Sequence, residues 1–318
     1  MQPLKIVFFG SSPFAVPSLQ WLLESPFEVC CVVTQPDKKR GRGMHLGGTA
    51  VKTIAQQAHV ELFQPECVNS SFSLRRLSAY SADLFVVVAY GQLFSDKLLK
   101  VPGICAVNLH ASLLPKYRGA APVNWALIRG EEVTGTTVMR MESKMDAGPL
   151  IIQKPAPILP FDNALTLTEK LAGEGAQLLG AALTKIARKD FTLTPQDESQ
   201  ATFAPRLKKT DGLIDWSAPA TEIHNLVRGC LSWPGAYTFY RGRMLKVYKT
   251  RPLQQLPGEQ PRYGDGEVVE VRKDAIVVSC AASLLSIEEL QPEGKRRMSC
   301  SEFISGHRIG AGERFSNK

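Results

Sequence analysis

An asparagine, a histidine and an aspartate near the middle of the chain have the chemistry needed to stabilise an oxyanion. Asn108 and His110 lie two positions apart in an apolar run that predicts a strand, so their side chains point to the same side. Asparagine can donate a hydrogen bond to a developing negative oxygen, and histidine can donate to the same oxygen or relay a proton. Asp146 follows the next predicted strand, and its carboxylate is the best candidate for orienting the imidazole. On spacing alone, a structural histidine and a turn-forming aspartate explain these residues equally well.

The region that must position these side chains is predicted to be a doubly wound α/β domain. Buried strands are expected at residues 5–9, 29–34, 83–89, 104–110 and 136–141, and helices after residue 13 and at residues 49–58 and 166–186. Strands that alternate with helices predict a mostly parallel, Rossmann-like sheet, which binds its ligands at the carboxyl ends of the strands. Asn108 and His110 fall at one of those ends, while Leu109 between them is expected to face the packed interior.

A glycine turn after the first predicted strand resembles a dinucleotide site only in its position. In Gly10-Ser11-Ser12-Pro13, Ser12 stands where that motif needs a second glycine for close approach of a pyrophosphate. We therefore interpret Gly10 as part of a tight strand-to-helix turn kept for packing, and NAD binding is not expected.

The character of the sequence changes after residue 189. Residues 190–208 are polar, lack a clear period and predict a linker. A short helix at residues 221–228 is followed by short apolar segments at 236–240, 244–248, 266–272 and 275–280, separated by turn signals. This pattern predicts a small OB-like β-barrel. The expected organisation is a catalytic domain at 1–189, a linker at 190–208 and a second domain at 209–318.

The charge of the chain is compatible with a polyanionic partner. Its 318 residues carry 38 Lys and Arg against 30 Asp and Glu, for a net charge of +8. Two basic groups stand out: Lys38, Lys39, Arg40 and Arg42 in a glycine-containing loop, and Arg241, Arg243, Lys246 and Lys249 in the second domain. Strand alternation would put Tyr240 on the same face as several of the second group. Ordinary solvated surfaces are the alternative explanation for both groups.

Other classes of protein are disfavoured by composition. The seven cysteines are scattered without a CxxC pair, and the five histidines are isolated, so neither a disulfide framework nor a metal site is expected. The N-terminal apolar run is too short for a secretory signal, and no stretch approaches a membrane span. We therefore expect a cytoplasmic protein.

Residues 108–119, NLHASLLPKYRG, resemble the signature of enzymes that use 10-formyltetrahydrofolate. With residues 34–37, 41–43, 120–127, 145–148 and 290–299, the match extends over nearly the whole chain and is similar to the methionyl-tRNA formyltransferase family. By this resemblance, Asn108, His110 and Asp146 fall on the catalytic triplet. The resemblance also implies folate contacts from Ser112, Leu113, Leu114 and Pro115, and from backbone around Val88, Tyr90, Gly91 and Gln92.

The resemblance implies transfer of a formyl group from 10-formyltetrahydrofolate to the amino group of methionyl initiator tRNA, for translation initiation. The neutral amine would attack the formyl carbon while Asn108 and His110 stabilise the oxyanion, and Asp146 would position His110 and assist proton removal. No covalent enzyme intermediate and no metal would be needed. The loop from Lys38 to Arg42 would contact the tRNA acceptor end, with Arg42 reading the first base position. We expect the enzyme to act as a monomer.

Four alternatives remain at this point. A formyltransferase acting on a nucleotide-linked amino sugar can share the signature and a small barrel, but the basic residues favour tRNA. A glycinamide ribonucleotide formyltransferase would leave the second domain unexplained, and a formyl-folate hydrolase would need water as the acceptor. A nucleic-acid-binding module with an inert sheet domain would leave Asn108, His110 and Asp146 without a role.

Overall fold

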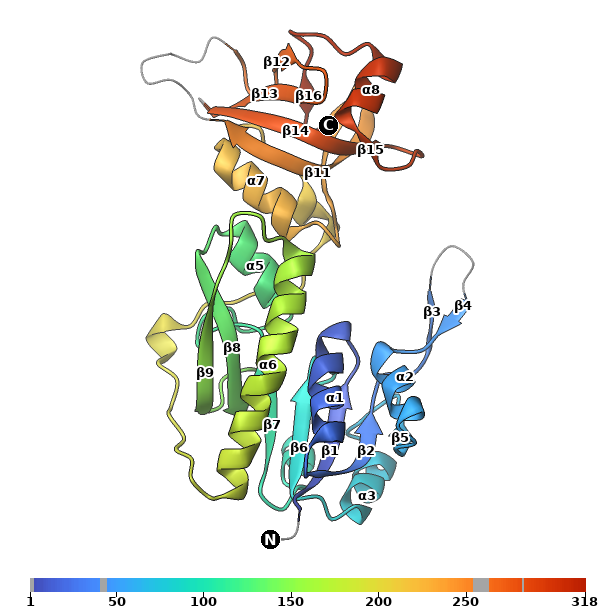
Figure 1. Ribbon diagram of the computed structural model, residues 1–318, viewed down its shortest axis with the longest axis vertical. Helices are drawn as coiled ribbons and strands as arrows, with labels where there is room; N and C mark the ends of the chain where they lie inside the picture. The colour runs from blue at the N-terminus through green and yellow to red at the C-terminus, as the bar shows by residue number, and fades with distance from the viewer. Residues whose placement is uncertain (1–2, 41–44, 254–262, 282) are drawn as a thin grey trace. The chain divides into compact units, whose positions relative to one another are not determined.

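The computed structural model describes residues 3–40, 45–253, 263–281 and 283–318. The chain divides into two compact units (Figure 1). The first comprises Met1–Pro122, Val133–Pro157 and Thr168–Ala204, and the second comprises Val123–Glu132, Ile158–Leu167 and Pro205–Lys318. In the described ranges, none of the helices combines the length and the apolar character needed to cross a membrane.

The first unit is built on a seven-stranded sheet with the order β5-β2-β1-β6-β7-β8-β9. The strands are β1 Lys5–Gly10, β2 Glu28–Val33, β5 Leu62–Phe63, β6 Leu84–Val88, β7 Cys105–His110, β8 Val133–Arg140 and β9 Leu150–Pro157. The first five of these pair in parallel, whereas β8 and β9 are antiparallel to their neighbours. The predicted mostly parallel sheet is therefore confirmed, with an antiparallel edge beyond β7.

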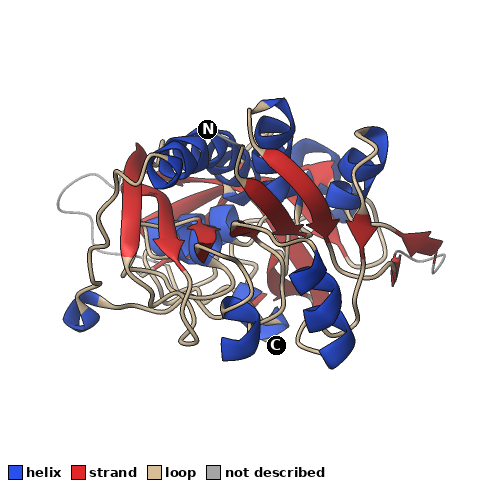
Figure 2. Cartoon of the chain, turned by 90° about the horizontal axis from the view of Figure 1, so that it is seen from below, coloured by secondary structure: helices blue, strands red, loops and turns tan. Residues whose placement is uncertain are grey.

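Helices cover both faces of this sheet (Figure 2). They are α1 Val16–Glu24, α2 Ala50–Gln57, α3 Ser71–Ala79, α4 Asp96–Leu99 and α6 Ala164–Ala187, with a 3-10 turn η1 at Pro13–Ala15. Leu77 of α3 and Leu98 of α4 join the apolar cluster on one face. On the other face, a Cβ on Gly175 of α6 would lie 3.0 Å from the Leu109 side chain. Leu109 thus faces the packed interior, as predicted.

Local sequence signals explain where several of these elements begin. Thr49, Ser70 and Ser95 each accept a hydrogen bond from a backbone N–H in the first turn of α2, α3 and α4. At the end of β1, a Cβ on Gly10 would lie 2.8 Å from the Ala15 Cβ atom, so this glycine permits close packing of strand and helix. The structure therefore agrees with a packing role for Gly10.

Two segments differ in form from their predictions. Residues predicted as a loop after β2 include a two-stranded ribbon, β3 Lys38–Arg40 with β4 His45–Gly47, because pairing satisfies the backbone groups of both ends. The segment predicted as a linker is fastened to the first unit as far as Ala204. Within it lie an antiparallel bridge from Thr194 to Leu150 and the short 3-10 helix η2 at Glu198–Gln200.

The second unit contains a separate, curled antiparallel sheet with the order β12-β13-β14-β11-β10-β16, and β15 pairs with β14. The strands are β10 Ala236–Tyr240, β11 Arg243–Leu253, β12 Val268–Val271, β13 Ile276–Cys280, β14 Ser283–Pro292, β15 Met298–Ser299 and β16 Phe315–Ser316. The helices are α5 Pro122–Ile128, α7 Ala220–Gly229 and α8 Cys300–His307, with a 3-10 turn η3 at Lys209–Gly212.

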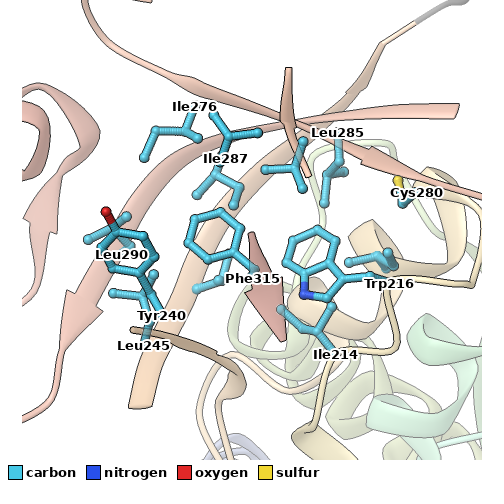
Figure 3. Packing of buried hydrophobic residues seen from close by; sticks show 14 of the residues in the cluster. Ile214, Trp216, Tyr240, Leu245, Ile276, Cys280, Leu285, Ile287, Leu290 and Phe315 are labelled. Carbon is cyan, nitrogen blue, oxygen red and sulfur yellow. The ribbon is translucent and has the colours of Figure 1, made fainter. Parts of the chain in front are cut away.

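Aromatic side chains form the centre of the second unit's core (Figure 3). The rings of Trp216 and Phe315 are stacked with centroids 5.6 Å apart, and Tyr240 meets Phe315 edge-on at 5.6 Å. Leu245, Ile287 and other buried aliphatic residues of β11, β13 and β14 surround these rings. Burial of this apolar surface stabilises the curled sheet.

Candidate functional site

The carboxyl ends of three neighbouring parallel strands place the candidate residues at one edge of the first unit's sheet. Val88, the last residue of β6, lies beside Gly10, the last residue of β1. Asn108 of β7 is in register with Val87 of β6, and His110 ends β7. Asn108 and His110 therefore occupy same-face positions at the sheet edge where ligands bind in this class of fold.

The imidazole of His110 is buried and has a partner group at each nitrogen. Its Nε2 atom lies 2.9 Å from the Tyr117 carbonyl oxygen, and its Nδ1 atom lies 3.7 Å from Oδ2 of Asp146. Because a carbonyl oxygen only accepts, Nε2 carries a hydrogen in this arrangement. The neutral imidazole then has its lone pair on Nδ1, facing the carboxylate, and a proton gained at Nδ1 would be stabilised by Asp146.

Asp146 is held with its carboxylate directed toward His110. Its backbone has a φ of 51°, in the left-handed region that few residues other than glycine adopt. The Oδ2 atom accepts a hydrogen bond of 2.9 Å from the backbone N–H of Gly119. The structure thus brings together Asp146 and His110, which lie on separate segments, as the hypothesis of an oriented imidazole requires.

The segment of the predicted folate contacts, residues 112–115, is fixed by the hydroxyl group of Thr137. This hydroxyl donates to the Ser112 carbonyl at 2.6 Å and accepts from the Leu114 backbone N–H at 3.2 Å. The side-chain amide of Gln153 donates to the same hydroxyl and to the Leu114 carbonyl. Ser112 and Leu114 are buried, whereas Leu113 and Pro115 are partly exposed. Neither Thr137 nor Gln153 is among the site residues predicted from the sequence.

The segment after β6 alternates buried side chains with exposed backbone. Val88 and Tyr90 are buried, and the Tyr90 ring packs against Phe9 in the core of the first unit. Ala89 and Gly91 between and after them are exposed and have φ values of 47° and 95°. The side chain of Tyr90 therefore packs into the core and does not point to the sheet edge.

Gln92 keeps this segment in place. Its Oε1 atom accepts from the Val68 backbone N–H at 2.9 Å, and its Nε2 atom donates to the Glu66 carbonyl at 3.2 Å. These hydrogen bonds tie the Gln92 side chain to the neighbouring loop, whereas the folate contact that the resemblance implies comes from backbone. By these bonds the Gln92 side chain fixes the position of the preceding residues 88–91.

The base of the β3–β4 ribbon is anchored by Asp37. This carboxylate pairs with the Lys52 ammonium at 2.5 Å and accepts from the Gln64 side-chain amide at 2.8 Å. Lys38 follows directly and is exposed. For Lys39 and Arg40 the structure describes the backbone within β3, and Arg42 lies outside the described residues.

The four basic residues predicted to contact tRNA in the second unit differ in their surroundings. Arg241 pairs with Glu313 at 2.9 Å, and Lys249 pairs with Glu288 at 3.0 Å, which raises the pKa of Lys249. Arg243 is exposed and Lys246 is partly exposed, and neither forms an ion pair with another residue that the structure describes. The charges of Arg243 and Lys246 are therefore the less compensated pair.

The expectation that Tyr240 shares the basic face is wrong. Its ring is buried in the core of the second unit, 7% exposed, and its hydroxyl group donates to Glu313 at 2.7 Å. Burial is the largest cause that raises the pKa of Tyr240 to about 12. The large ring fits inside the curled sheet because its polar end still reaches an acceptor at the rim.

Two further residues near the site were missed by the sequence analysis. Arg118 is 2% exposed and bonds to Gln196 and Glu198, which lie in the segment predicted as a linker. The place of Arg118 within the NLHASLLPKYRG signature was the sequence signal that could have marked it, whereas its burial, which requires several partners, is seen only in the structure. Gln196 lies in a polar stretch without periodicity, where nothing in the sequence marked it. Among the described residues there is no group of three or more His, Cys, Asp or Glu that could hold a metal ion.

Comparisons with known proteins match both parts of the chain. The formyl transferase family model matches residues 4–183, and the model of the formyl transferase C-terminal domain matches residues 206–308. A methionyl-tRNA formyltransferase of Caldanaerobacter subterraneus subsp. tengcongensis is 43% identical over 310 residues, which cover 97% of this chain and 99% of that protein. This chain therefore matches the relative along almost its full length.

Solved structures with less similar sequences share the fold. The sugar 3N-formyl transferase WlaRD, solved with dTDP and 5-N-formyl-THF, has a TM-score of 0.67 and 19% identity over 92% of this chain and 99% of that chain. HypX from Aquifex aeolicus, in complex with tetrahydrofolic acid, has a TM-score of 0.63 and 18% identity over 98% of this chain and 49% of that chain. At these identities the likeness concerns the fold alone.

Proposed function

The chain belongs to the methionyl-tRNA formyltransferase family, and from this membership we propose that Asn108, His110 and Asp146 carry out its formyl transfer. The reaction moves the formyl group of 10-formyltetrahydrofolate to the α-amino group of methionyl initiator tRNA, for translation initiation. The observation that carries the assignment of residues is the position of Nδ1 of His110, 3.7 Å from the Asp146 carboxylate at the carboxyl end of β7.

Proton transfer in this mechanism runs through Nδ1 of His110. The hydrogen bond to the Tyr117 carbonyl holds the other ring nitrogen, so Nδ1 is the atom that accepts the proton lost by the attacking amine. Asp146 stabilises the imidazolium that results, and the same proton passes to the leaving nitrogen of the folate. Asn108, on the same side of β7, donates to the formyl oxygen as it becomes negative. The donation to this oxygen that was expected from His110 as well is not part of the mechanism, because Nε2 is bonded to the Tyr117 carbonyl.

The residues around the sheet edge fit a reduced folate as the formyl donor. A pterin ring carries an edge of hydrogen-bond donors and acceptors, which backbone groups can pair with. Ala89 and Gly91 offer such groups, and a Cβ on Gly91 would meet nothing within 4 Å, so the space beside it is open. Residues 112–115, fixed by Thr137, provide the second side of the proposed folate site.

Division of labour along the chain follows the predicted boundaries in this proposal. Residues 1–189 bind the folate and perform the transfer. Residues 190–208 lead to the second domain but stay fastened to the first unit as far as Ala204, and residues 209–318 form an OB-like domain that contacts the tRNA backbone. The basic residues Lys38, Lys39, Arg40 and Arg42 contact the acceptor end. We propose further that the enzyme acts as a monomer in the cytoplasm.

Parallel reactions with two different acceptors test the function. The purified chain is given 10-formyltetrahydrofolate with charged initiator tRNA in one reaction and with a dTDP-linked amino sugar in another, and products are identified by mass spectrometry. We expect formylmethionyl-tRNA in the first reaction and little product in the second. Preferential formylation of the sugar would contradict the tRNA assignment.

A further inference from the structure

The backbone of the turn that carries Asp146 has a strained conformation. Asp146 has its φ in the left-handed region, and a Cβ on Gly148 would lie 1.9 Å from the Arg140 carbonyl oxygen. The turn is thus pressed against the end of β8 in a conformation that an aspartate adopts at a cost. Such a conformation persists only where surrounding groups hold it.

The side-chain amide of Gln196 supplies that hold. Its Nε2 atom donates to the carbonyl oxygens of Asp146, at 2.9 Å, and Gly148, at 2.7 Å. Its Oε1 atom accepts from Nε of Arg118 at 3.1 Å and from Nη2 at 2.7 Å. Because a guanidinium only donates and a carbonyl only accepts, the amide has a single orientation that satisfies all four contacts.

Arg118 is in turn fixed from its far side. Its guanidinium, buried at 2% exposure, donates to Glu198 at 2.7 and 3.2 Å, and Glu198 also pairs with Lys144 at 2.7 Å. Hydrogen bonds from Arg118 and then from Lys144 lower the pKa of Glu198 to about 2, so this carboxylate is ionised at neutral pH. Lys144 belongs to the same turn as Asp146. The segment around Gln196 therefore bonds to the turn at three positions, Lys144, Asp146 and Gly148.

We propose that Gln196 is a positioning residue for formyl transfer, which directs the Asp146 carboxylate at His110 by holding the backbone of its turn. The carboxylate itself is received by the N–H of Gly119, the residue next to Arg118. The Asp146 backbone is therefore held through Gln196 by Arg118, and its carboxylate is held by Gly119, the next residue in the chain. This inference rests on the proposed function, because it assigns Gln196 its effect through Asp146.

The first test separates the two halves of the Gln196 amide. Gln196→Leu removes both, whereas Gln196→Glu keeps an acceptor for Arg118 and replaces the donor by a repelling oxygen. We expect both variants to lower kcat for formylation of methionyl-tRNA about 10- to 100-fold, since small displacements of reacting groups have effects of that size. KM for both substrates should change little. Gln200→Leu, at an exposed position in the same segment, is the matched control and should keep wild-type kcat.

Wild-type activity of Gln196→Glu would overturn the proposal, because the side chain would then serve only to satisfy Arg118. Should the leucine variant fail to fold, the glutamate variant alone decides, judged against Gln200→Glu.

The second test is a double-mutant cycle with Asp146→Asn, measured as single-turnover rates. If Gln196 acts through Asp146, Gln196→Leu adds little to the loss already caused by Asp146→Asn. Losses that multiply would overturn the proposal, because Gln196 would then act independently of the carboxylate. If Asp146→Asn alone leaves the rate unchanged, the assigned role of Asp146 in the proposed function fails, and this result is distinct from the failure of the Gln196 inference.

Discussion

The candidate site of the first unit and the core of the second unit use different interactions to hold aromatic and polar groups in place. Around His110, polar groups are held by hydrogen bonds and charge. The imidazole contacts the Tyr117 carbonyl and the Asp146 carboxylate, and Gln196, bonded to Arg118, holds the turn that carries Asp146. In the second unit, stacked rings of Trp216 and Phe315 fill an apolar core, and charged side chains lie outside it. We therefore expect substitutions in the first region to lower the rate of formyl transfer, and substitutions in the second to lower the free energy of unfolding or the affinity for tRNA.

The largest effect is expected from Phe315→Ala, which leaves a cavity beside Trp216 and Tyr240. Loss of a buried aromatic ring lowers the free energy of unfolding by about 3–5 kcal/mol. Urea denaturation followed by circular dichroism measures this change. Phe161→Ala, at a side chain that is 76% exposed in the same unit, is the control and should cost about 0.5 kcal/mol or less. If both variants lost the same free energy of unfolding, the aromatic core would not be what stabilises the second unit.

Asn108→Ala should lower kcat about 10²- to 10³-fold while the fold stays intact, because one oxyanion donor is worth about 2.7–4 kcal/mol. Asn108→Asp, which keeps the size of the side chain and loses the donor, should be similarly impaired. Steady-state kinetics with charged initiator tRNA measures both, and exposed Asn317→Ala serves as control. Turnover near the wild-type rate in the alanine variant would remove Asn108 from the mechanism.

Substitution of the less compensated cations should weaken tRNA binding more than substitution of the paired ones. Arg243→Ala and Lys246→Ala each remove a charge without freeing an acidic partner, and each should reduce the salt slope of the binding constant by about 0.7–0.9 if it contacts a phosphate. Arg241→Ala and Lys249→Ala are matched comparisons, because Glu313 and Glu288 already offset those charges. Binding titrations at several salt concentrations measure the slopes. The same slope for all four variants would contradict this distinction.

An effect that appears only at low pH concerns His224 in the second unit. Burial, and then the charge of Arg228, lower the pKa of this imidazole from 6.5 to about 4. The unfolded chain therefore binds a proton here first, and the free energy of unfolding falls as the pH drops from about 6.5 towards 4. His224→Gln removes this contribution, so its Tm should decline less steeply over that interval than that of the wild type. Exposed His59→Asn is the control, and parallel Tm curves for wild type and His224→Gln would refute the assignment.

Features that depend on local periodicity were predictable from the order of the amino acids. Alternation along a strand places Asn108 and His110 on one face and Leu109 on the other, and the apolar runs predict the mostly parallel sheet whose edge carries them. The NLHASLLPKYRG segment indicated an enzyme that uses 10-formyltetrahydrofolate, and the matches in residues 34–37, 41–43 and 290–299 were needed to indicate the family.

The groups that complete the site are distant in sequence and became known from the folded chain. Gln196 reaches Asp146 across 50 residues of sequence, and Thr137 holds the Leu114 backbone across 23, so no periodic pattern could reveal these contacts. Tyr240 likewise faces inward because the curled sheet has an apolar interior and Glu313 receives its hydroxyl group. Periodicity records which side of an element a residue occupies, whereas hydrogen-bond partners depend on where the chain returns after folding.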